Sequence, residues 1–236
     1  MFQLFNNTGQ PASAALIKMC GFTRVQDIEC AIENNVNAVG FVFYPKSQRY
    51  IDLEQAKILT QNVPENIQVT GLFVNANTET IANICEKIRI DLLQFHGDLN
   101  IETPEWCREC AGLVNKHYIK AVGIHNNSST DFISTTYDKY MGNNAQGILL
   151  DTKTSGYGGS GVSFNWDIIP KYLLADNKSR IILSGGINLN NLLQALALQP
   201  YAVDLSSAVE NGINGIKDTD KIKQIMHLIK SQNNNE

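Results

Sequence analysis

The sequence predicts a single (β/α)8 (TIM) barrel, and three observations support this fold class. Short apolar runs recur eight times from residue 14 onwards, and patterns typical of helices separate them. Several runs are apolar at nearly every position, as in parallel strands that are covered on both faces. No Pro/Ser-rich linker or block of charge interrupts the alternation. Eight strand–helix units favour a closed barrel over an open doubly wound sheet, since no GxGxxG motif follows the first run.

The elements follow one another in a regular order. We expect a polar lead-in over residues 1–13, the barrel over 14–230 and a polar tail over 231–236. Strands are expected to begin near Ala14, Ala38, Gln68, Asp91, His117, Ala145, Arg180 and Ala202. Helices are expected at Val25–Asn34, Leu53–Gln61, Glu79–Ile88, Pro104–Cys110, Ser129–Tyr140, Asn165–Tyr172, Leu189–Ala197 and Asp218–Ile229. The candidate N-caps are Thr23, Asp52 and either Asn77 or Thr78.

The composition narrows the class of protein. Apolar residues make up 43% of the 236 residues and charged residues 18%, an ordinary globular balance. The net charge of −4 argues against a nucleic-acid partner, although backbone amides can still bind a local phosphate. The chain has neither a signal-peptide pattern nor an apolar run approaching the ~20 residues of a membrane span. With five cysteines, an odd number, we expect a cytoplasmic protein with reduced thiols, no membrane contact and, by default, a monomer.

The ends of the first two strands carry candidate reactive groups, because side chains at the carboxyl ends of barrel strands point into the active site. Cys20 ends the first strand, where nearby positive charge would lower its pKa and make it a base or nucleophile. A small buried hydrophobe is an equally good interpretation of its position. Arg49 follows the second strand and can grip a carboxylate with two parallel hydrogen bonds. Position alone favours a solvated loop arginine there.

The fourth and sixth strands end in His96 and Asp151. His96 has no second histidine at ligand spacing, so we expect a structural residue and no metal site. Burial behind the apolar run Gly147–Leu150 would keep the Asp151 carboxyl protonated, as a general acid requires. An N-cap or an ion pair with Lys153 is the alternative. The glycine-rich stretch 154–161, which follows directly and is expected to be a flexible loop, favours a functional role for Asp151.

The last two strands predict a phosphate-binding barrel. Gly185 and Gly186 follow the seventh strand, and Ser206 and Ser207 follow the eighth. Loops in these two places form the usual phosphate cradle of such barrels. A separate Cys-x-x-Cys pair, Cys107–Cys110, lies on one face of an expected helix and has no partner pair. It is expected to serve packing rather than metal or redox chemistry.

These strand ends, taken together, resemble the phosphoribosylanthranilate isomerase family. The resemblance runs from Lys18 to Glu210 and rests on these segments in order: KMCGFTR, GFVFYPKSQRYI, GLFVN, LLQFHGD, LLDTKTSGYGGSG, FNW, ILSGGIN and PYAVDLSSAVE. It implies an Amadori rearrangement of N-(5-phosphoribosyl)anthranilate to 1-(2-carboxyphenylamino)-1-deoxyribulose 5-phosphate in tryptophan biosynthesis. It also implies a small phosphorylated substrate, no cofactor and no metal.

The resemblance further implies a role for each site residue. Cys20 would be the general base, Asp151 the general acid, and Arg49 the ligand of the anthranilate carboxylate. The phosphate would bind around Gly185, Gly186, Ser206 and Ser207, Asp204 would contact the sugar, and the loop after the sixth strand would close over the substrate. The chain departs from the family pattern at Gln48, where proline is common, and at Ala208, where glycine is common.

Two alternatives remain at this point. A sugar-phosphate isomerase of histidine synthesis shares the phosphate cradle but uses two aspartates, and Cys20 disfavours it. A catalytically silent barrel that binds a phosphorylated regulator is disfavoured because Cys20 and Asp151 are both present.

Overall fold

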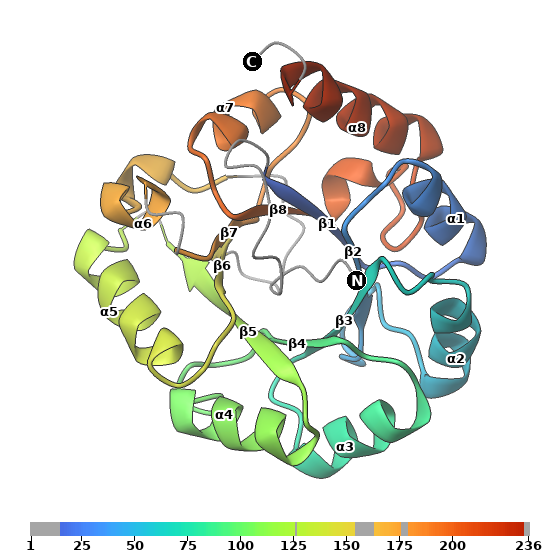
Figure 1. Ribbon diagram of the computed structural model, residues 1–236, viewed down its shortest axis with the longest axis horizontal. Coiled ribbons are helices and arrows are strands. Elements are labelled where there is room, and N and C mark those ends of the chain that lie inside the picture. The colour runs from blue at the N-terminus through green and yellow to red at the C-terminus, as the bar shows by residue number, and fades with distance from the viewer. Residues whose placement is uncertain (1–14, 126, 154–162, 176–178, 234–236) are drawn as a thin grey trace.

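The structure is a computed structural model that describes residues 15–125, 127–153, 163–175 and 179–233 of the chain. Eight parallel strands pair in sequence order and close on themselves through β8 and β1, with the helices outside them (Figure 1). The strands are β1 (Leu16–Cys20), β2 (Ala38–Val42), β3 (Gln68–Phe73), β4 (Leu92–Phe95), β5 (His117–Ile124), β6 (Ile148–Thr152), β7 (Ile181–Leu183) and β8 (Ala202–Leu205). The predicted fold class is therefore confirmed.

The helices follow the strands in the predicted order. They are α1 (Val25–Glu33), α2 (Leu53–Gln61), α3 (Thr78–Lys87), α4 (Pro104–Leu113), α5 (Thr130–Met141), α6 (Lys171–Ala175), α7 (Leu192–Ala197) and α8 (Thr219–Asn233). Two short 3₁₀ helices, η1 (Trp166–Ile168) and η2 (Ser207–Val209), lie after β6 and β8. Among the described helices, none has both the length and the apolar character that a membrane crossing requires.

Capping explains where several helices begin. Asp52 accepts a hydrogen bond from the Gln55 amide, and Asn77, rather than Thr78, accepts one from the Thr80 amide. The predicted cap at Thr23 is wrong. Arg24 is the N-cap of α1 and makes no side-chain capping bond, while the Thr23 hydroxyl donates instead to the Gly215 carbonyl at 2.6 Å.

Several helices differ from the predicted bounds, and for two of them the structure shows a local reason. The helix expected at Asn165–Tyr172 is split into η1 and α6, because Pro170 lies between them and the preceding Ile169 is extended, with φ −72° and ψ 125°. Helix α7 begins at Leu192, since the Asn191 side chain accepts from the Asn188 amide and forms a turn ahead of the helix. Helix α8 runs past Ile229 to Asn233.

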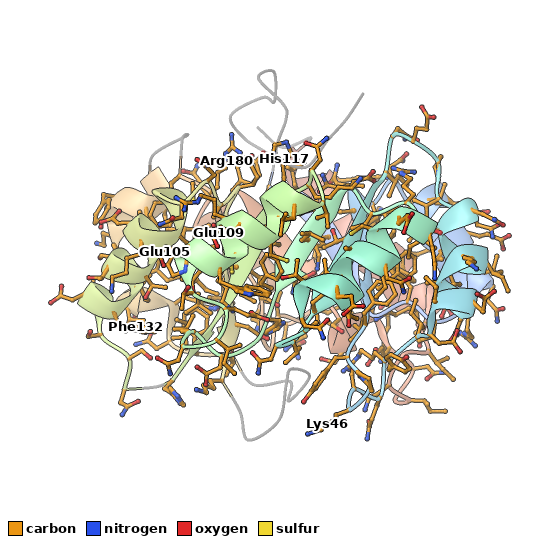
Figure 2. The ribbon with its side chains drawn as sticks, turned by 90° about the horizontal axis from the view of Figure 1, so that it is seen from below. Lys46, Glu105, Glu109, His117, Phe132 and Arg180 are labelled. Atoms are coloured by element: carbon orange, nitrogen blue, oxygen red, sulfur yellow. The ribbon has the colours of Figure 1, made fainter. Side chains whose placement is uncertain are left out.

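The barrel interior changes character along its axis. Its amino-terminal end is filled by apolar side chains, including Leu16, Leu92, Leu149 and Ala202. Further along β1 the inward-facing residue is Lys18, so charged groups begin below the carboxyl end of the barrel. In side view, Lys46, after β2, lies at this mouth end, and His117 and Arg180, at strand starts, lie at the other (Figure 2).

A second, larger apolar core fills the space between the strands and the surrounding helices. Cys107 and Cys110 of α4 belong to it and are almost fully buried. Burial raises the pKa of both thiols, which keeps them in the neutral form that suits packing. Their positions agree with the packing role predicted for this pair.

Candidate active site

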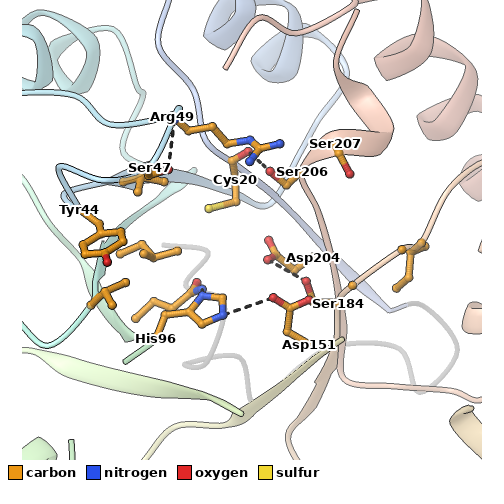
Figure 3. Close-up of a pocket in the computed structure, with 17 residues that line it drawn as sticks. Cys20, Tyr44, Ser47, Arg49, His96, Asp151, Ser184, Asp204, Ser206 and Ser207 are labelled. Atoms are coloured by element: carbon orange, nitrogen blue, oxygen red, sulfur yellow. Dashed lines mark hydrogen bonds and ion pairs between the residues drawn. The ribbon is translucent and has the colours of Figure 1, made fainter. Parts of the chain in front are cut away.

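A cavity opens at the carboxyl ends of the strands, with an empty volume of about 710 Å³ that includes the solvent at its mouth (Figure 3). Its lining comes from both halves of the barrel. All predicted site residues contribute to it: Cys20, Arg49, Asp151, Gly185, Gly186, Asp204, Ser206 and Ser207. The structure thus brings together groups that the sequence spreads over almost the whole chain.

Cys20 ends β1 as a free, buried thiol facing the cavity (Figure 3). Its neighbour across the β1–β2 ladder is Gly40, and a Cβ at Gly40 would lie 2.6 Å from the Cys20 Sγ. Position 40 must therefore be glycine for the Cys20 thiol to lie where it does. Burial raises the pKa of the Cys20 thiol, while the ammonium of Lys18 acts to lower it and the carboxylate of Asp204 to raise it.

Asp151 lies on the far side of the cavity from Cys20, beside His96 (Figure 3). His96 Nε2 is 3.3 Å from Asp151 Oδ2, and His96 Nδ1 is 3.3 Å from the side-chain nitrogen of Gln94. With that amide nitrogen facing Nδ1, Nδ1 can accept a hydrogen bond and Nε2–H can donate one to Asp151. The alternative partner Lys153 is exposed, and no ion pair joins it to Asp151 in the part of the chain that the structure describes.

His96 is a site residue whose role the sequence alone does not predict. Its lack of a histidine partner indicates a structural residue, yet it lines the cavity and contacts the candidate acid. The available signal is its place directly after β4 and before Gly97, the same strand-end position that singles out Cys20 and Asp151.

Arg49 is buried and held by a carboxylate, so it is not a solvated loop arginine. Its Nε and Nη2 donate to the two carboxylate oxygens of Glu210, both at 2.7 Å, and Nη2 also donates to Asn214 at 2.9 Å. Burial acts to raise the pKa of Glu210, but hydrogen bonds from Arg49 and the charge of Lys217 outweigh it and lower that pKa. The bidentate geometry expected for a substrate carboxylate is therefore occupied by Glu210.

Asp204, on β8, is paired inside the barrel. Its Oδ1 accepts from the fully buried Lys18 Nζ at 2.7 Å, and Ser184 lies 3.4 Å from its Oδ2. Lys18 is the ladder partner of Asp204 between β1 and β8. The pair places one positive and one negative charge directly below the Cys20 thiol.

The loops after β7 and β8, where the sequence predicts a phosphate cradle, line the cavity. Gly185 and Gly186 adopt φ values of +75° and +71°, which favour glycine. A Cβ at Gly185 would lie 2.3 Å from the Thr152 amide nitrogen, so the chain approaches β6 closely there. Ser206 bonds back to the Cys20 carbonyl at 3.2 Å, and Ser207 begins η2, which also contains Ala208. The glycine-rich stretch 154–161, expected to be a loop over the site, lies outside the described residues.

The pocket combines a thiol, a carboxyl group beside an imidazole, an arginine and two glycine- or serine-bearing loops. Within the described residues, no group of three or more His, Cys, Asp or Glu side chains is arranged to hold a metal ion. Fold and site together define an enzyme of the phosphate-binding (β/α)8-barrel class with acid–base groups at its mouth.

Comparison with known proteins identifies the family. A sequence model of N-(5′-phosphoribosyl)anthranilate (PRA) isomerase matches residues 17–227. The N-(5′-phosphoribosyl)anthranilate isomerase of Pseudomonas putida (strain GB-1) is 41% identical over 215 residues, covering 90% of this chain and 96% of that protein. The chain therefore belongs to the phosphoribosylanthranilate isomerase family, and it is an isomerase of tryptophan biosynthesis.

Solved structures agree with this assignment. The crystal structure of phosphoribosyl anthranilate isomerase from Thermotoga maritima superposes with a TM-score of 0.79 at 37% identity, covering 92% of this chain and 99% of that one. A family structure in complex with reduced 1-(o-carboxyphenylamino)-1-deoxyribulose 5-phosphate gives a TM-score of 0.76 at 33% identity, with the same coverage.

Proposed function

We propose that this chain rearranges N-(5-phosphoribosyl)anthranilate with Cys20 as general base and Asp151 as general acid. The observation that supports this assignment is the placement of the two groups across one cavity, which Arg49 and the loops after β7 and β8 also line (Figure 3). General acid–base catalysis needs the acid within hydrogen-bond reach of the atom that gains a proton, and the base within reach of the proton that it removes. The family structure that holds a reduced 5-phosphate compound supports a phosphorylated small-molecule substrate.

The proposed reaction begins with two proton transfers. Asp151 gives its proton to the ribose ring oxygen, the C1′–O bond breaks, and the nitrogen lone pair forms an iminium group at C1′. The Cys20 thiolate then takes the proton from C2′, and the electron pair of that C–H bond neutralises the iminium to give an enolamine. In the tautomerisation C1′ gains the proton held by Cys20 and the C2′ hydroxyl gives its proton to Asp151, which yields the ketone and returns both groups to their starting states. His96, whose Nε2 is 3.3 Å from Asp151 Oδ2, holds the carboxyl group in place.

The remaining site residues bind the substrate in this proposal. Glu210 occupies Nε and Nη2 of Arg49, so the two N–H groups of Nη1 are assigned to the anthranilate carboxylate. Asp204 contacts the sugar and is held for this purpose by its ion pair with Lys18. The phosphate is assigned to the backbone and hydroxyl donors of Gly185, Gly186, Ser206 and Ser207.

We also propose a monomer that works in the cytoplasm. All five cysteines are free thiols, which agrees with a reducing compartment. The most exposed large apolar side chains are distributed over α2, α4, α6 and the segment after η2: Ile58, Leu113, Tyr172 and Ile213. Light scattering on the purified protein tests the monomer, and a mass of two chains would overturn it.

The experiment that tests the mechanism compares turnover of freshly prepared phosphoribosylanthranilate, followed by loss of its fluorescence, in wild type and Cys20→Ala. Removal of a general base is expected to lower turnover by about 10²–10⁴-fold. Cys85→Ala is the matched control, because the Cys85 thiol is half-buried on α3 and does not line the cavity. Equal turnover in the two alanine variants would remove Cys20 from the mechanism.

A further inference from the structure

Lys217 is a buried lysine between η2 and α8 that has no part in the mechanism above. Its Nζ donates to the carbonyl oxygen of Cys20 at 2.6 Å, to that of Ser206 at 3.2 Å, and to Glu210 Oε1 at 3.2 Å. These acceptors belong to the residue that carries the proposed base, to the phosphate cradle and to the carboxylate that holds Arg49. One ammonium group thus contacts all three parts of the site.

The backbone around Lys217 is fixed from the opposite side by α1. The Lys217 amide donates to Asp27 Oδ2 at 3.0 Å, and the Lys217 carbonyl accepts from Arg24 Nη2 at 3.1 Å. Asp27 and Arg24 are themselves joined by an ion pair of 2.6 Å. A lysine held at its amide, its carbonyl and its ammonium has a defined position, unlike a solvated surface lysine.

The charged groups around the Cys20 thiol come from several segments packed against β1. The cations are Lys18, Arg49 and Lys217, and the carboxylates beside them are Asp204 and Glu210. Asp151 and His96 lie across the cavity. With all five neighbouring groups ionised, positive charge is in excess on this side, and positive charge favours a thiolate.

Burial disfavours the charged forms of both Cys20 and Lys217, and neighbouring charges act against this effect. Burial raises the pKa of the Cys20 thiol, and Lys217 is one of the groups that act against this effect. Burial lowers the pKa of the Lys217 ammonium, whereas Glu210 and the Cys20 thiolate act to raise it. The ammonium and the thiolate therefore stabilise each other in a place where water does not.

We propose that Lys217 is a positioning residue that fixes the carbonyl groups at the ends of β1 and β8 and supplies positive charge favouring the Cys20 thiolate. The catalytic meaning of this inference rests on the proposed role of Cys20 as the base. The effect on the thiol itself does not, because it can be measured without substrate. A purely structural lysine would tie the two strand ends together and leave the ionisation of the thiol unchanged.

The test measures the rate of Cys20 alkylation by iodoacetamide as a function of pH, with the modified Cys20 peptide quantified by mass spectrometry. Lys217→Met removes the charge and the hydrogen bonds, and Lys217→Gln keeps N–H donors but no charge. Both are expected to move the midpoint of alkylation upward by about one pH unit or more, because a nearby opposite charge changes a pKa by that amount. Lys221→Met is the control: Lys221 Nζ donates to the Glu210 carbonyl at 2.7 Å, and within the described residues no hydrogen bond joins it to Cys20 or Ser206.

Lys217→Arg, which keeps the charge, is expected to restore the wild-type midpoint. An unchanged midpoint in Lys217→Gln overturns the inference even when Lys217→Met fails to fold, because Lys217→Gln retains the donors that hold the two strand ends. If the midpoint moves but Cys20→Ala still turns over normally, the base assignment fails and the effect of Lys217 on the thiol stands. If both hold, turnover of Lys217→Gln near neutral pH falls about tenfold for every pH unit by which the alkylation midpoint rises.

Discussion

The place of the Cys20 thiol depends on the absence of a side chain at Gly40, and Gly40→Ala is the most direct test of the site geometry. The added Cβ would lie 2.6 Å from Sγ and 3.1 Å from the Cα and Cβ of Cys20. Non-bonded carbon atoms are in contact at about 3.5–4.0 Å, so the thiol must move by roughly 1 Å. The ladder between β1 and β2 restrains both backbones, so the larger displacement falls on Sγ, while the Cys20 Cα gives by a few tenths of an ångström.

A misplacement of about 1 Å at a reacting group costs on the order of 10²-fold in rate. We expect kcat of Gly40→Ala to fall by that factor, with little change in KM, because Arg49 and the loops after β7 and β8 are not touched. Overpacking of a buried site costs about 1–3 kcal/mol, so the variant should fold with a lowered unfolding temperature. Steady-state turnover and thermal unfolding measure the two effects separately.

Gly112→Ala provides the matched control for Gly40→Ala. Gly112 lies in α4, and a Cβ there would meet no atom within 4 Å. Alanine is a better helix former than glycine by about 0.5–1 kcal/mol, so this variant should be slightly more stable and fully active. Turnover of Gly40→Ala equal to that of Gly112→Ala would refute the argument that the thiol position is set by this glycine.

Three further changes test the other groups of the pocket. Asp151→Asn is expected to abolish ring opening in a single-turnover assay, and normal turnover would place the acid elsewhere. Arg49→Ala is expected mainly to raise KM, because carboxylate binding is present in both ground and transition states; an unchanged KM would assign the carboxylate to another residue. Glu210→Gln leaves two buried cations without their carboxylate, so urea unfolding should show it less stable by about 3–5 kcal/mol at neutral pH. Because the folded pKa of Glu210 is lowered, its stabilising contribution is present above the unfolded pKa of about 4.3 and is lost as pH falls through the folded pKa. The difference between wild type and Glu210→Gln should therefore shrink in acid, and a pH-independent difference would contradict the assignment.

The strands and the main site residues could be predicted because both depend on local patterns. A strand covered on both faces must be apolar throughout, which makes it visible as a run in the sequence. Closing parallel strands into a barrel brings all their carboxyl ends to one mouth, so Cys20 and Asp151 meet although β1 and β6 are far apart in the chain. The break between η1 and α6 also had a local signal, Pro170, that the helical pattern obscured.

The buried charges could not be predicted, because the partner of each lies far away in the sequence. Lys18 and Asp204 are 186 positions apart, and Arg49 and Glu210 are 161 positions apart. A lysine in the middle of β1 appears in the sequence as an interruption of an apolar run, and only the three-dimensional contact explains why it can be buried. The place of His96 in the site is hidden for a related reason, since it depends on a contact with Asp151 of β6.

These buried ion pairs lie around the cavity at the mouth of the barrel. Their location indicates what they contribute to the protein. A buried ion pair adds little net stability compared with well-packed apolar residues, because removing both charges from water costs about as much as their attraction returns. The pairs at the mouth are Lys18–Asp204, Arg49–Glu210 with Lys217, and Lys120–Glu102. Each pair holds a residue of the pocket or the neighbour of one. In the third pair, Glu102 accepts from the Gly97 amide at 2.7 Å and Lys120 donates to the Gly97 carbonyl at 2.8 Å, and Gly97 is next to His96. A gain in stability does not explain charged residues at these positions. All three ion pairs are explained if they fix the orientation of the side chains that line the cavity.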